Sequence, residues 1–90
     1  MLTIKYETTF KKDFNRIVRR GYDIRLLERV IEMLANGHAL PEKCRDHSLI
    51  GEYADCRECH ITPDWSLIYR ISNTELILYL TRTGPHSDLF

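Results

Sequence analysis

Hydrophobic and polar residues follow one another along the chain in a pattern that predicts a strand, two helices and then several strands. Residues 2–6 alternate apolar and polar side chains, which is typical of a half-buried strand. From Phe10 to Val18 the apolar side chains recur at i, i+4, i+7 and i+8 and form one stripe. This spacing predicts an amphipathic helix, and Gly21 is suited to end it.

A second amphipathic helix is predicted for residues 24–36. Asp23 is suited to cap it, and Gly37 and Pro41 end it. Its apolar positions form one stripe, made of Leu27, Val30, Ile31 and Leu34. Because only a short turn separates the two helices, we expect a helical hairpin packed on one face of a sheet.

The remainder of the chain predicts strands joined by short turns. The turn at 62–64 contains a proline and an aspartate, which is typical turn chemistry. The expected strands span residues 44–49, 53–61, 65–72 and 75–83, with a tail at 84–90 that folds back or stays open. This order predicts a single α+β domain over residues 1–90, with a two-helix hairpin on one face of a small, mainly antiparallel sheet.

Length and composition exclude several other classes of protein. The chain has 90 residues, of which 43% are hydrophobic and 29% charged, so neither a disordered nor a fibrous protein is expected. No apolar run approaches the roughly 18 residues that a membrane span needs. The N-terminus lacks the apolar segment of a signal peptide, so we expect a cytoplasmic protein without a membrane partner.

Charge is balanced overall but distributed unevenly. Thirteen basic and thirteen acidic residues give a formal net charge of zero. Residues 1–29 hold eight basic and four acidic residues, a net of +4, which leaves −4 for residues 30–90. We expect the basic side chains of the first helix to meet RNA phosphates, with Lys11, Lys12 and Arg16 as the named candidates.

Three cysteines occur, an odd number that disfavours a closed set of disulfides. Residues 56–60 match the C-x-x-C-H pattern of haem attachment, but that chemistry needs a turn entering a helix, and this stretch predicts a strand. A zinc site built from Cys44, Cys56, Cys59 and His60 is the second alternative. Cys56 and Cys59 point to opposite faces of an extended strand, so we expect free thiols, no metal and no cofactor.

Three of the four histidines, His47, His60 and His86, lie at or near the ends of predicted strands. Imidazole titrates near neutral pH, so one ring can accept a proton while another donates one. RNA carries its own nucleophile, the 2′-hydroxyl, and its cleavage needs a base, an acid and a cation for the phosphorane charge. Arg82 at the end of the last strand offers the cation.

Roles within this set follow from neighbouring residues. We expect His60 to be the base, because Asp64 in the same turn favours its protonated form, and His86 to be the acid. His47 either shares the base role or orients the 2′-hydroxyl. Trp65 and Phe90 are expected to offer faces on which an unstacked base can lie.

Three ordered segments resemble the YafQ-like toxins of the RelE/ParE superfamily. Residues 46–51 (D-H-S-L-I-G) resemble their D-H-x-L-x-G block, and residues 57–69 resemble R-x-x-H-[IV]-x-P-D-W-x-L-I-Y. Residues 82–90 resemble their R-T-G-x-H-x-x-L-F terminus, and residues 6–13 are similar in style. The likeness therefore spans nearly the whole chain.

The resemblance implies a RelE-like fold and a toxin of a type II toxin–antitoxin pair that cuts mRNA on translating ribosomes. It implies a DinJ/RelB-like antitoxin, the ribosome and mRNA as partners. The functional positions of the family fall on His47, His60, Asp64, Trp65, Arg82, His86 and Phe90. Such toxins tend to be basic, and this chain departs from them by its neutral charge.

Two alternatives share the same fold. A toxin of the ParE kind acts by binding gyrase and has no need of a histidine-rich site. An inactive member would act only as an interaction module. Three histidines in matching blocks favour the ribonuclease over the gyrase-binding toxin.

Overall fold

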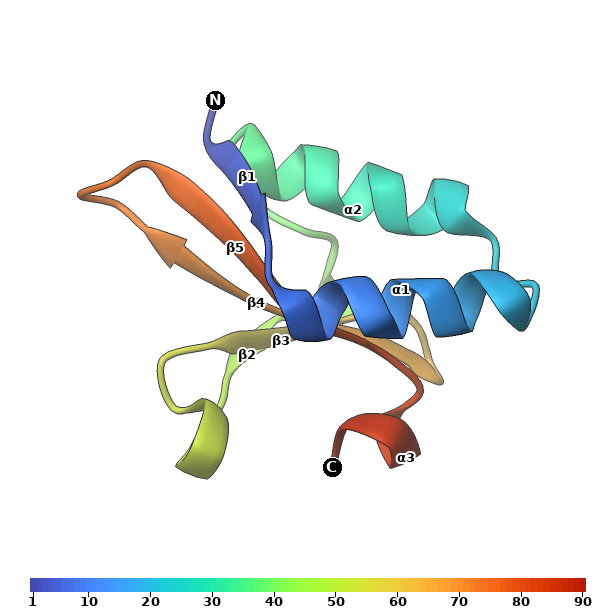
Figure 1. Cartoon of the computed structure of the whole chain (residues 1–90). Helices are drawn as coiled ribbons and strands as arrows, with labels where there is room; N and C mark the ends of the chain where they lie inside the picture. The colour runs from blue at the N-terminus through green and yellow to red at the C-terminus, as the bar shows by residue number, and fades with distance from the viewer.

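One five-stranded sheet, with two helices against one of its faces, makes up most of the molecule (Figure 1). The computed structural model describes all 90 residues. The strands are β1 Thr3–Tyr6, β2 His47–Ser48, β3 Arg57–Thr62, β4 Trp65–Ser72 and β5 Ile77–Gly84. The helices are α1 Thr8–Arg19, α2 Ile24–Ala35 and α3 His86–Leu89, with 3-10 turns η1 Glu42–Cys44 and η2 Gly51–Tyr53. None of these helices is long and apolar enough to cross a membrane.

The sheet has the strand order β1-β5-β4-β3-β2. Only the β1–β5 pair is parallel. Parallel strands need a long crossover connection, and here the helical hairpin and the other three strands lie between β1 and β5 in the chain. The other three pairs are antiparallel. This arrangement confirms the predicted α+β fold and its mainly antiparallel sheet.

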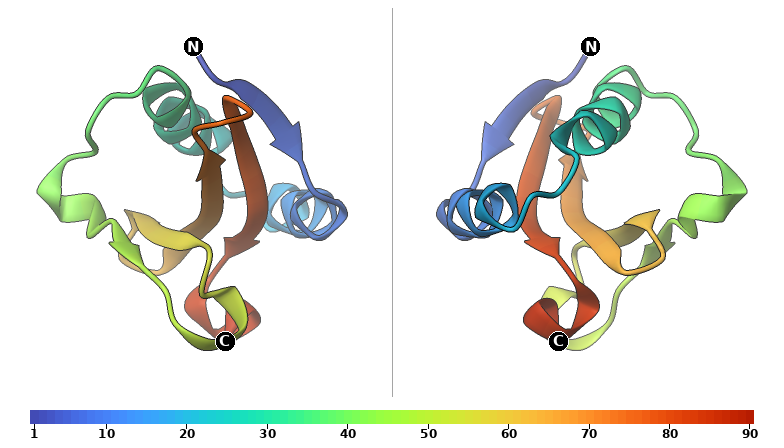
Figure 2. Two further views of the ribbon diagram at one scale, coloured as in Figure 1. Left: turned by 90° about the vertical axis from the view of Figure 1, so that its left-hand side faces the viewer. Right: turned by 90° about the vertical axis from the view of Figure 1, so that its right-hand side faces the viewer.

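Two strand starts predicted in the second half of the chain are wrong. The strand expected at 44–49 is only His47–Ser48, because η1 occupies the residues up to Cys44. The strand expected from Tyr53 begins at Arg57, since η2 takes up the residues before it. The tail takes the first of its two predicted arrangements: it folds back as α3 and packs beside η2, at the opposite end of the molecule from the N-terminus (Figure 2).

The main core lies between the helical hairpin and the sheet. It contains the predicted stripes of α1 and α2 together with alternate residues of β4 and β5, including Leu67, Tyr69, Leu78 and Leu80. A second, smaller cluster lies on the other face of the sheet and is made of Cys56, Ile68, Leu89, Leu49 and Tyr53. This second cluster fixes α3 and η2 beneath the strands.

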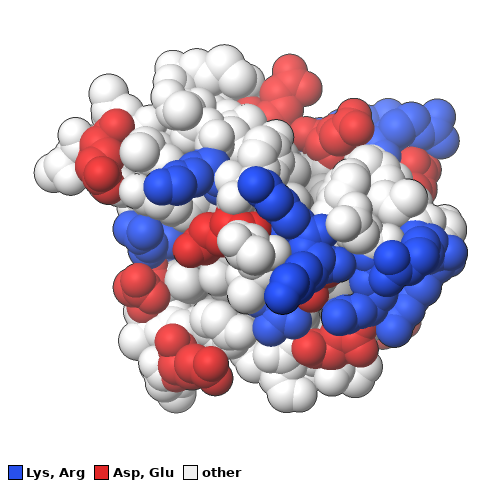
Figure 3. Space-filling model, viewed as in Figure 1, with Lys and Arg blue, Asp and Glu red and all other residues white.

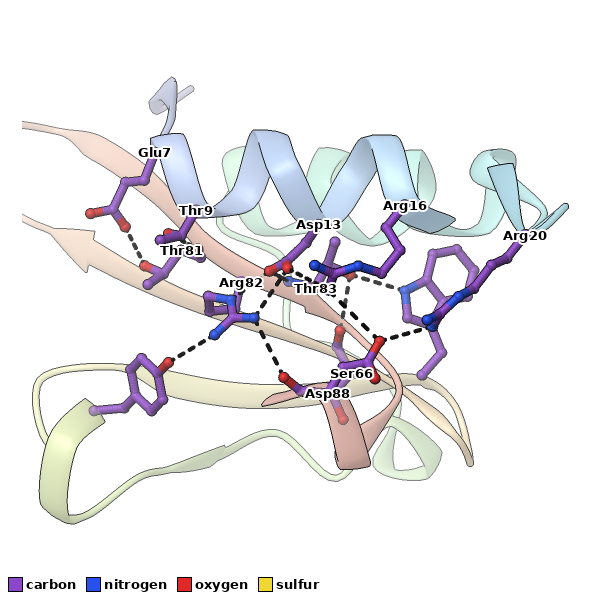
Figure 4. A network of polar contacts seen from close by, with 12 residues as sticks. Glu7, Thr9, Asp13, Arg16, Arg20, Ser66, Thr81, Arg82, Thr83 and Asp88 are labelled. Atoms are coloured by element: carbon purple, nitrogen blue, oxygen red, sulfur yellow. Dashed lines mark hydrogen bonds and ion pairs between the residues drawn. The ribbon is translucent and has the colours of Figure 1, made fainter. Parts of the chain in front are cut away.

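Polar side chains of α1 satisfy part of the β5 edge in place of a further strand. β1 pairs with β5 only from Ile77 to Leu80, so the residues after Leu80 have no strand on that side. There Thr9 Oγ1 donates to the Thr81 carbonyl at 2.7 Å, and the Thr81 hydroxyl donates to Glu7. Asp13 accepts the Thr83 N–H at 3.2 Å (Figure 4). Helix α1 therefore continues the edge protection that β1 begins.

A β-bulge at Thr81 decides which face Arg82 takes. Tyr69 pairs with Leu80 and Ile68 pairs with Arg82, so Thr81 is the extra residue of β5. Strict alternation after Leu78 and Leu80 would place Arg82 against the helices, in the main core. The bulge moves it to the face that carries Ile68, on which the second cluster lies.

The three thiols are free and buried, and Cys56 and Cys59 belong to clusters on opposite faces of the sheet. Burial raises the pKa of the Cys56 thiol and, more strongly, that of Cys59. Both groups therefore stay protonated, and hence weakly nucleophilic, at neutral pH.

We predict that the folded protein shows almost no reaction with a disulfide reagent such as Ellman's reagent at pH 8. All three thiols of the chain should react with the reagent when the protein is unfolded in guanidinium chloride. Free cysteine at the same pH is the control. A thiol in the folded protein that reacts at the rate of free cysteine would contradict the buried placement.

Candidate active site

Four side chains form a row across four strands, on the face of the sheet away from the helical hairpin. His47 pairs with Glu58, Glu58 with Ile68, and Ile68 with Arg82. Because neighbouring strands lie about 4.8 Å apart, Glu58 and Arg82 stand roughly 10 Å apart along this row. The fold therefore brings His47 and Arg82 onto one surface although they are far apart in the sequence.

A second row brings the C-terminus to the same surface. His60 pairs with Ser66, and Ser66 pairs with Gly84. Gly84 has φ +147°, a conformation that favours glycine, and it turns the chain into α3. As a result His86 and Phe90 lie over the row, with their rings 4.7 Å apart and Phe90 edge-on to Tyr53.

Glu58 is the buried acid at the centre of this cluster, with only 4% of its surface exposed. Its Oε1 lies 3.1 Å from His47 Nε2. The other nitrogen of His47, Nδ1, lies 2.6 Å from the Arg45 carbonyl, which can only accept, so Nδ1 carries a proton. Nε2 lies within ion-pair range of Glu58, so both ring nitrogens of His47 face a protein acceptor.

The second oxygen of Glu58 points toward His86. Oε2 is buried and has no hydrogen-bond partner within the protein, which is costly for a carboxylate oxygen. His86 Nδ1 lies 3.9 Å away, within ion-pair range, while the His86 side chain is 68% exposed. An Nδ1–H directed at Oε2 leaves Nε2 of this exposed ring free to meet a ligand.

His60 is half-buried on the same face of the sheet, beside His47. Its ring stacks on His47 with centroids 6.4 Å apart, and its Nδ1 lies 3.3 Å from Ser66 Oγ. When Nδ1–H donates to the serine hydroxyl, Nε2 has a free lone pair. In that tautomer His60 Nε2 is open to accept a proton.

Arg82 is held in place by a buried aspartate. Asp13, 2% exposed, accepts from Arg82 Nε and, at 3.1 Å, from Nη2. Arg82 Nη1 donates to the Tyr53 hydroxyl at 3.3 Å, and Nη2 reaches the Asp88 carbonyl at 3.5 Å. The hydrogen-bonded Asp13 carboxylate raises the pKa of Arg82 further above its ordinary value. Of the five guanidinium N–H groups, one on Nη1 remains for a ligand.

Ion pairs to Asp88 fasten α3 to the end of α1. Arg20 Nη1 lies 2.8 Å and Arg16 Nη1 3.8 Å from Asp88 Oδ2 (Figure 4). His86 and Phe90 flank Asp88 in the chain, so these pairs help to set their positions over the sheet. Arg16 itself is paired with both Asp13 and Asp88.

Asp46 anchors the short strand that carries His47. It accepts the Tyr69 hydroxyl at 2.6 Å and Arg57 Nε at 3.2 Å. Burial, with this hydrogen bond as a further cause, raises the pKa of Tyr69. Tyr69 therefore remains a donor over the physiological range and keeps β2 against β3.

Two predicted roles need correction. Trp65 is 3% exposed, donates its indole N–H to Thr83 Oγ1 at 2.9 Å and meets Tyr22 edge to face, so it has no face for a base. Asp64 is exposed and forms no hydrogen bond or ion pair with His60, whose polar partner is Ser66. Trp65 stabilises the sheet from inside the core instead.

The predicted basic residues lie along α1 but do not act as one group. On the face shown in Figure 3, lysine and arginine side chains gather in a band over α1 and its end. Lys12 is exposed and makes no ion pair, whereas Lys11 lines an apolar groove of about 470 Å³ between α1 and α2. The band is interrupted by acids, in keeping with the neutral total charge.

The two residues missed at the sequence level are both buried acids, Glu58 and Asp13. Asp13 lies at i+3 from Phe10 and i−4 from Ile17, on the buried stripe of α1, and this spacing was a signal that could have found it. Glu58 carries no such signal, because its burial depends on the pairing of β3 with its neighbours. Cys56 and Cys59 face opposite sides of the sheet, so they cannot chelate one ion together. No group of three or more His, Cys, Asp or Glu side chains is placed to hold a metal ion.

Comparisons with known proteins agree on one family. Residues 2–90 match the family model described as "Bacterial toxin of type II toxin-antitoxin system, YafQ". The mRNA interferase toxin YafQ of Escherichia coli K12 is 35% identical over 88 residues, covering 97% of this chain and 94% of that protein.

Solved structures agree over the full chain. A metal-bound toxin from Helicobacter pylori is 44% identical, with a TM-score of 0.93 and 100% of both chains covered. The toxin in an Escherichia coli DinJ–YafQ complex is 33% identical, with a TM-score of 0.90, covering 100% of this chain and 99% of that one. By the family model and by these relatives, the chain belongs to the YafQ family of bacterial toxins of type II toxin–antitoxin systems.

Proposed function

We propose that this protein is an mRNA interferase, a ribosome-dependent endoribonuclease that stops translation by cutting mRNA through the RNA's own 2′-hydroxyl. The observation that carries the proposal is the convergence of His47, His60 and His86 around the buried Glu58, beside Arg82. A toxin that acts only by binding gyrase needs no such cluster.

The first half of the reaction is assigned to His60. Its Nε2 takes the proton of the 2′-hydroxyl, and the 2′-oxygen forms a new bond to phosphorus. His47 is locked between the Arg45 carbonyl and Glu58, so it orients the hydroxyl and supports Glu58 rather than acting as a base.

The second half is assigned to His86. Its Nε2 gives a proton to the 5′-oxygen while the bond from that oxygen to phosphorus breaks. The products are a 2′,3′-cyclic phosphate and a 5′-hydroxyl, and the two histidines have exchanged protonation states. Glu58 Oε2 stands behind His86 Nδ1 and holds the ring with Nε2 toward the leaving oxygen.

Arg82 is assigned the role of stabilising the negative charge that develops on the phosphorane. Asp13 fixes the guanidinium plane in advance, so little reorganisation is needed when charge develops on the phosphate. No step of this scheme is routed through a metal ion. Phe90, 55% exposed, is the aromatic face available to a base now that Trp65 is assigned to the core.

An antitoxin of the DinJ/RelB-like class is the partner that this function requires, because a toxin must be held inactive until it is needed. The relative crystallised as a DinJ–YafQ complex supports this assignment. Ribosomes and mRNA are the other partners, which places the protein in the cytoplasm.

We predict that mRNA on programmed ribosomes is cleaved at least a hundredfold faster than the same RNA free in solution. A protein with a net charge of zero makes few phosphate contacts and holds free RNA weakly at physiological salt. Initial rates on the two substrates at 150 mM salt provide the measurement. Equal rates would contradict ribosome dependence, and cleavage of neither substrate would indicate an inactive interaction module.

We predict that replacing His86 by alanine slows cleavage of native mRNA by about 10²–10⁴-fold, with ribosome binding nearly unchanged. A message with a 5′-thio leaving group needs no acid, so His86→Ala should regain activity on it, while His60→Ala should not. Rescue of His60→Ala alone would show that the acid and the base are exchanged. If neither variant loses activity on native mRNA, the histidine mechanism is wrong.

A further inference from the structure

A polar pocket beside His60 is left unused by the mechanism above. It has a volume of about 370 Å³ and is lined by Lys43, Arg45, His60 and Pro63. A neighbouring hollow of about 280 Å³ shares Lys43, His60 and Pro63 and continues along the β3–β4 turn. The base of the reaction therefore opens on one side into a space with two cations and no carboxylate in its lining.

Both cations are free to meet an anion. Lys43 and Arg45 are exposed, and neither forms an ion pair with an acidic side chain of the protein. By contrast, arginines of other elements are paired with aspartates, among them Arg16, Arg20, Arg57 and Arg82. Two unpaired cations facing one polar hollow make a site for phosphate oxygens.

The backbone of Arg45 ties this pocket to the catalytic cluster. Arg45 has φ +48°, a left-handed conformation that is uncommon for a residue other than glycine. In this conformation its carbonyl accepts the Nδ1–H of His47 at 2.6 Å. The same residue therefore orients His47 through its backbone and offers its guanidinium to the pocket.

The position of the pocket determines which phosphate it meets. Turn η1 lies against the β2–β3 flank of the sheet, whereas α3 lies against β5 on the other side (Figure 2). The pocket is thus on the His60 side of the scissile phosphate, opposite His86. Under the proposed function, the direction from His86 toward His60 leads from the leaving 5′-oxygen toward the 5′ end of the RNA.

We propose that Lys43 and Arg45 bind the backbone phosphate on the 5′ side of the nucleotide whose 2′-hydroxyl attacks. They hold that nucleotide so that its 2′-hydroxyl faces His60. This subsite is separate from Arg82, which meets the scissile phosphate itself. The inference rests on the proposed ribonuclease function and adds a positioning site for the same substrate.

The test pairs a change in the protein with a change in the RNA. One message carries a neutral methylphosphonate at the phosphate 5′ of the reacting nucleotide, and a second carries it one position beyond the scissile phosphate. Single-turnover cleavage on programmed ribosomes is measured at saturating toxin for wild type and for the double variant Lys43→Gln, Arg45→Gln. The double variant Lys5→Gln, Arg29→Gln removes two exposed cations elsewhere and is the matched control.

We expect the first methylphosphonate to slow wild type by roughly tenfold, since a charged hydrogen bond is lost. The Lys43, Arg45 variant should be slowed about as much on native mRNA, with no further loss on this methylphosphonate. Lys43→Arg with Arg45→Lys should restore most of the rate. The second methylphosphonate should affect wild type and variant alike, and the control variant should behave as wild type.

Three outcomes would overturn the inference. If the rate losses from the first methylphosphonate and from the Lys43, Arg45 variant multiply when combined, the pocket does not contact this phosphate. If the variant instead becomes insensitive to the second methylphosphonate alone, the pocket binds RNA on the 3′ side of the scissile phosphate. A variant that only needs a higher toxin concentration, with no sensitivity to either methylphosphonate, would assign the two cations to ribosomal RNA. Failure of wild type to cleave native mRNA would instead refute the proposed function.

Discussion

The buried carboxylate of Asp13 is the constraint on which the site depends most. It accepts hydrogen bonds from the Thr83 backbone and from Arg82, and it also pairs with Arg16. One side chain thereby protects the open edge of β5, compensates a partly buried guanidinium and connects α1 to the strand that leads into α3. A buried acid with this many donors is stable only while each of them stays in place.

Sheet register does the remaining positioning. The row from His47 through Glu58 and Ile68 to Arg82 requires a bulge at Thr81, because regular alternation would direct Arg82 into the core. Glu58 then has one oxygen on His47 and the other directed at His86. Burying these acids lowers the stability of the fold, but it fixes the orientations of the proton donor and acceptor.

Periodicity was sufficient to predict the helical hairpin, β4, most of β5 and the α+β class, since these elements have long, clear stripes of apolar residues. The strand at 44–49 was predicted too long and the tail was left with two alternatives, because 3-10 turns and a four-residue helix leave no period to detect. Motifs located the histidines and Arg82, but they assigned Trp65 to substrate, although its burial depends on Thr83 and Tyr22. Glu58 was missed for a related reason, since its burial depends on its partners in space, whereas Asp13 lies on the buried stripe of α1.

Asp13 and Arg82 act as one unit, and a double-mutant cycle tests this coupling most directly. Urea unfolding would be measured for wild type, Asp13→Asn, Arg82→Gln and the variant with both changes. Each single change should lower the free energy of unfolding by about 2–4 kcal/mol, because each leaves a buried polar group without its charged partner. The combined variant should lose less than the sum of the two by at least about 1.5 kcal/mol. Losses that add to within about 0.5 kcal/mol would show that the two residues act independently and would contradict the claim.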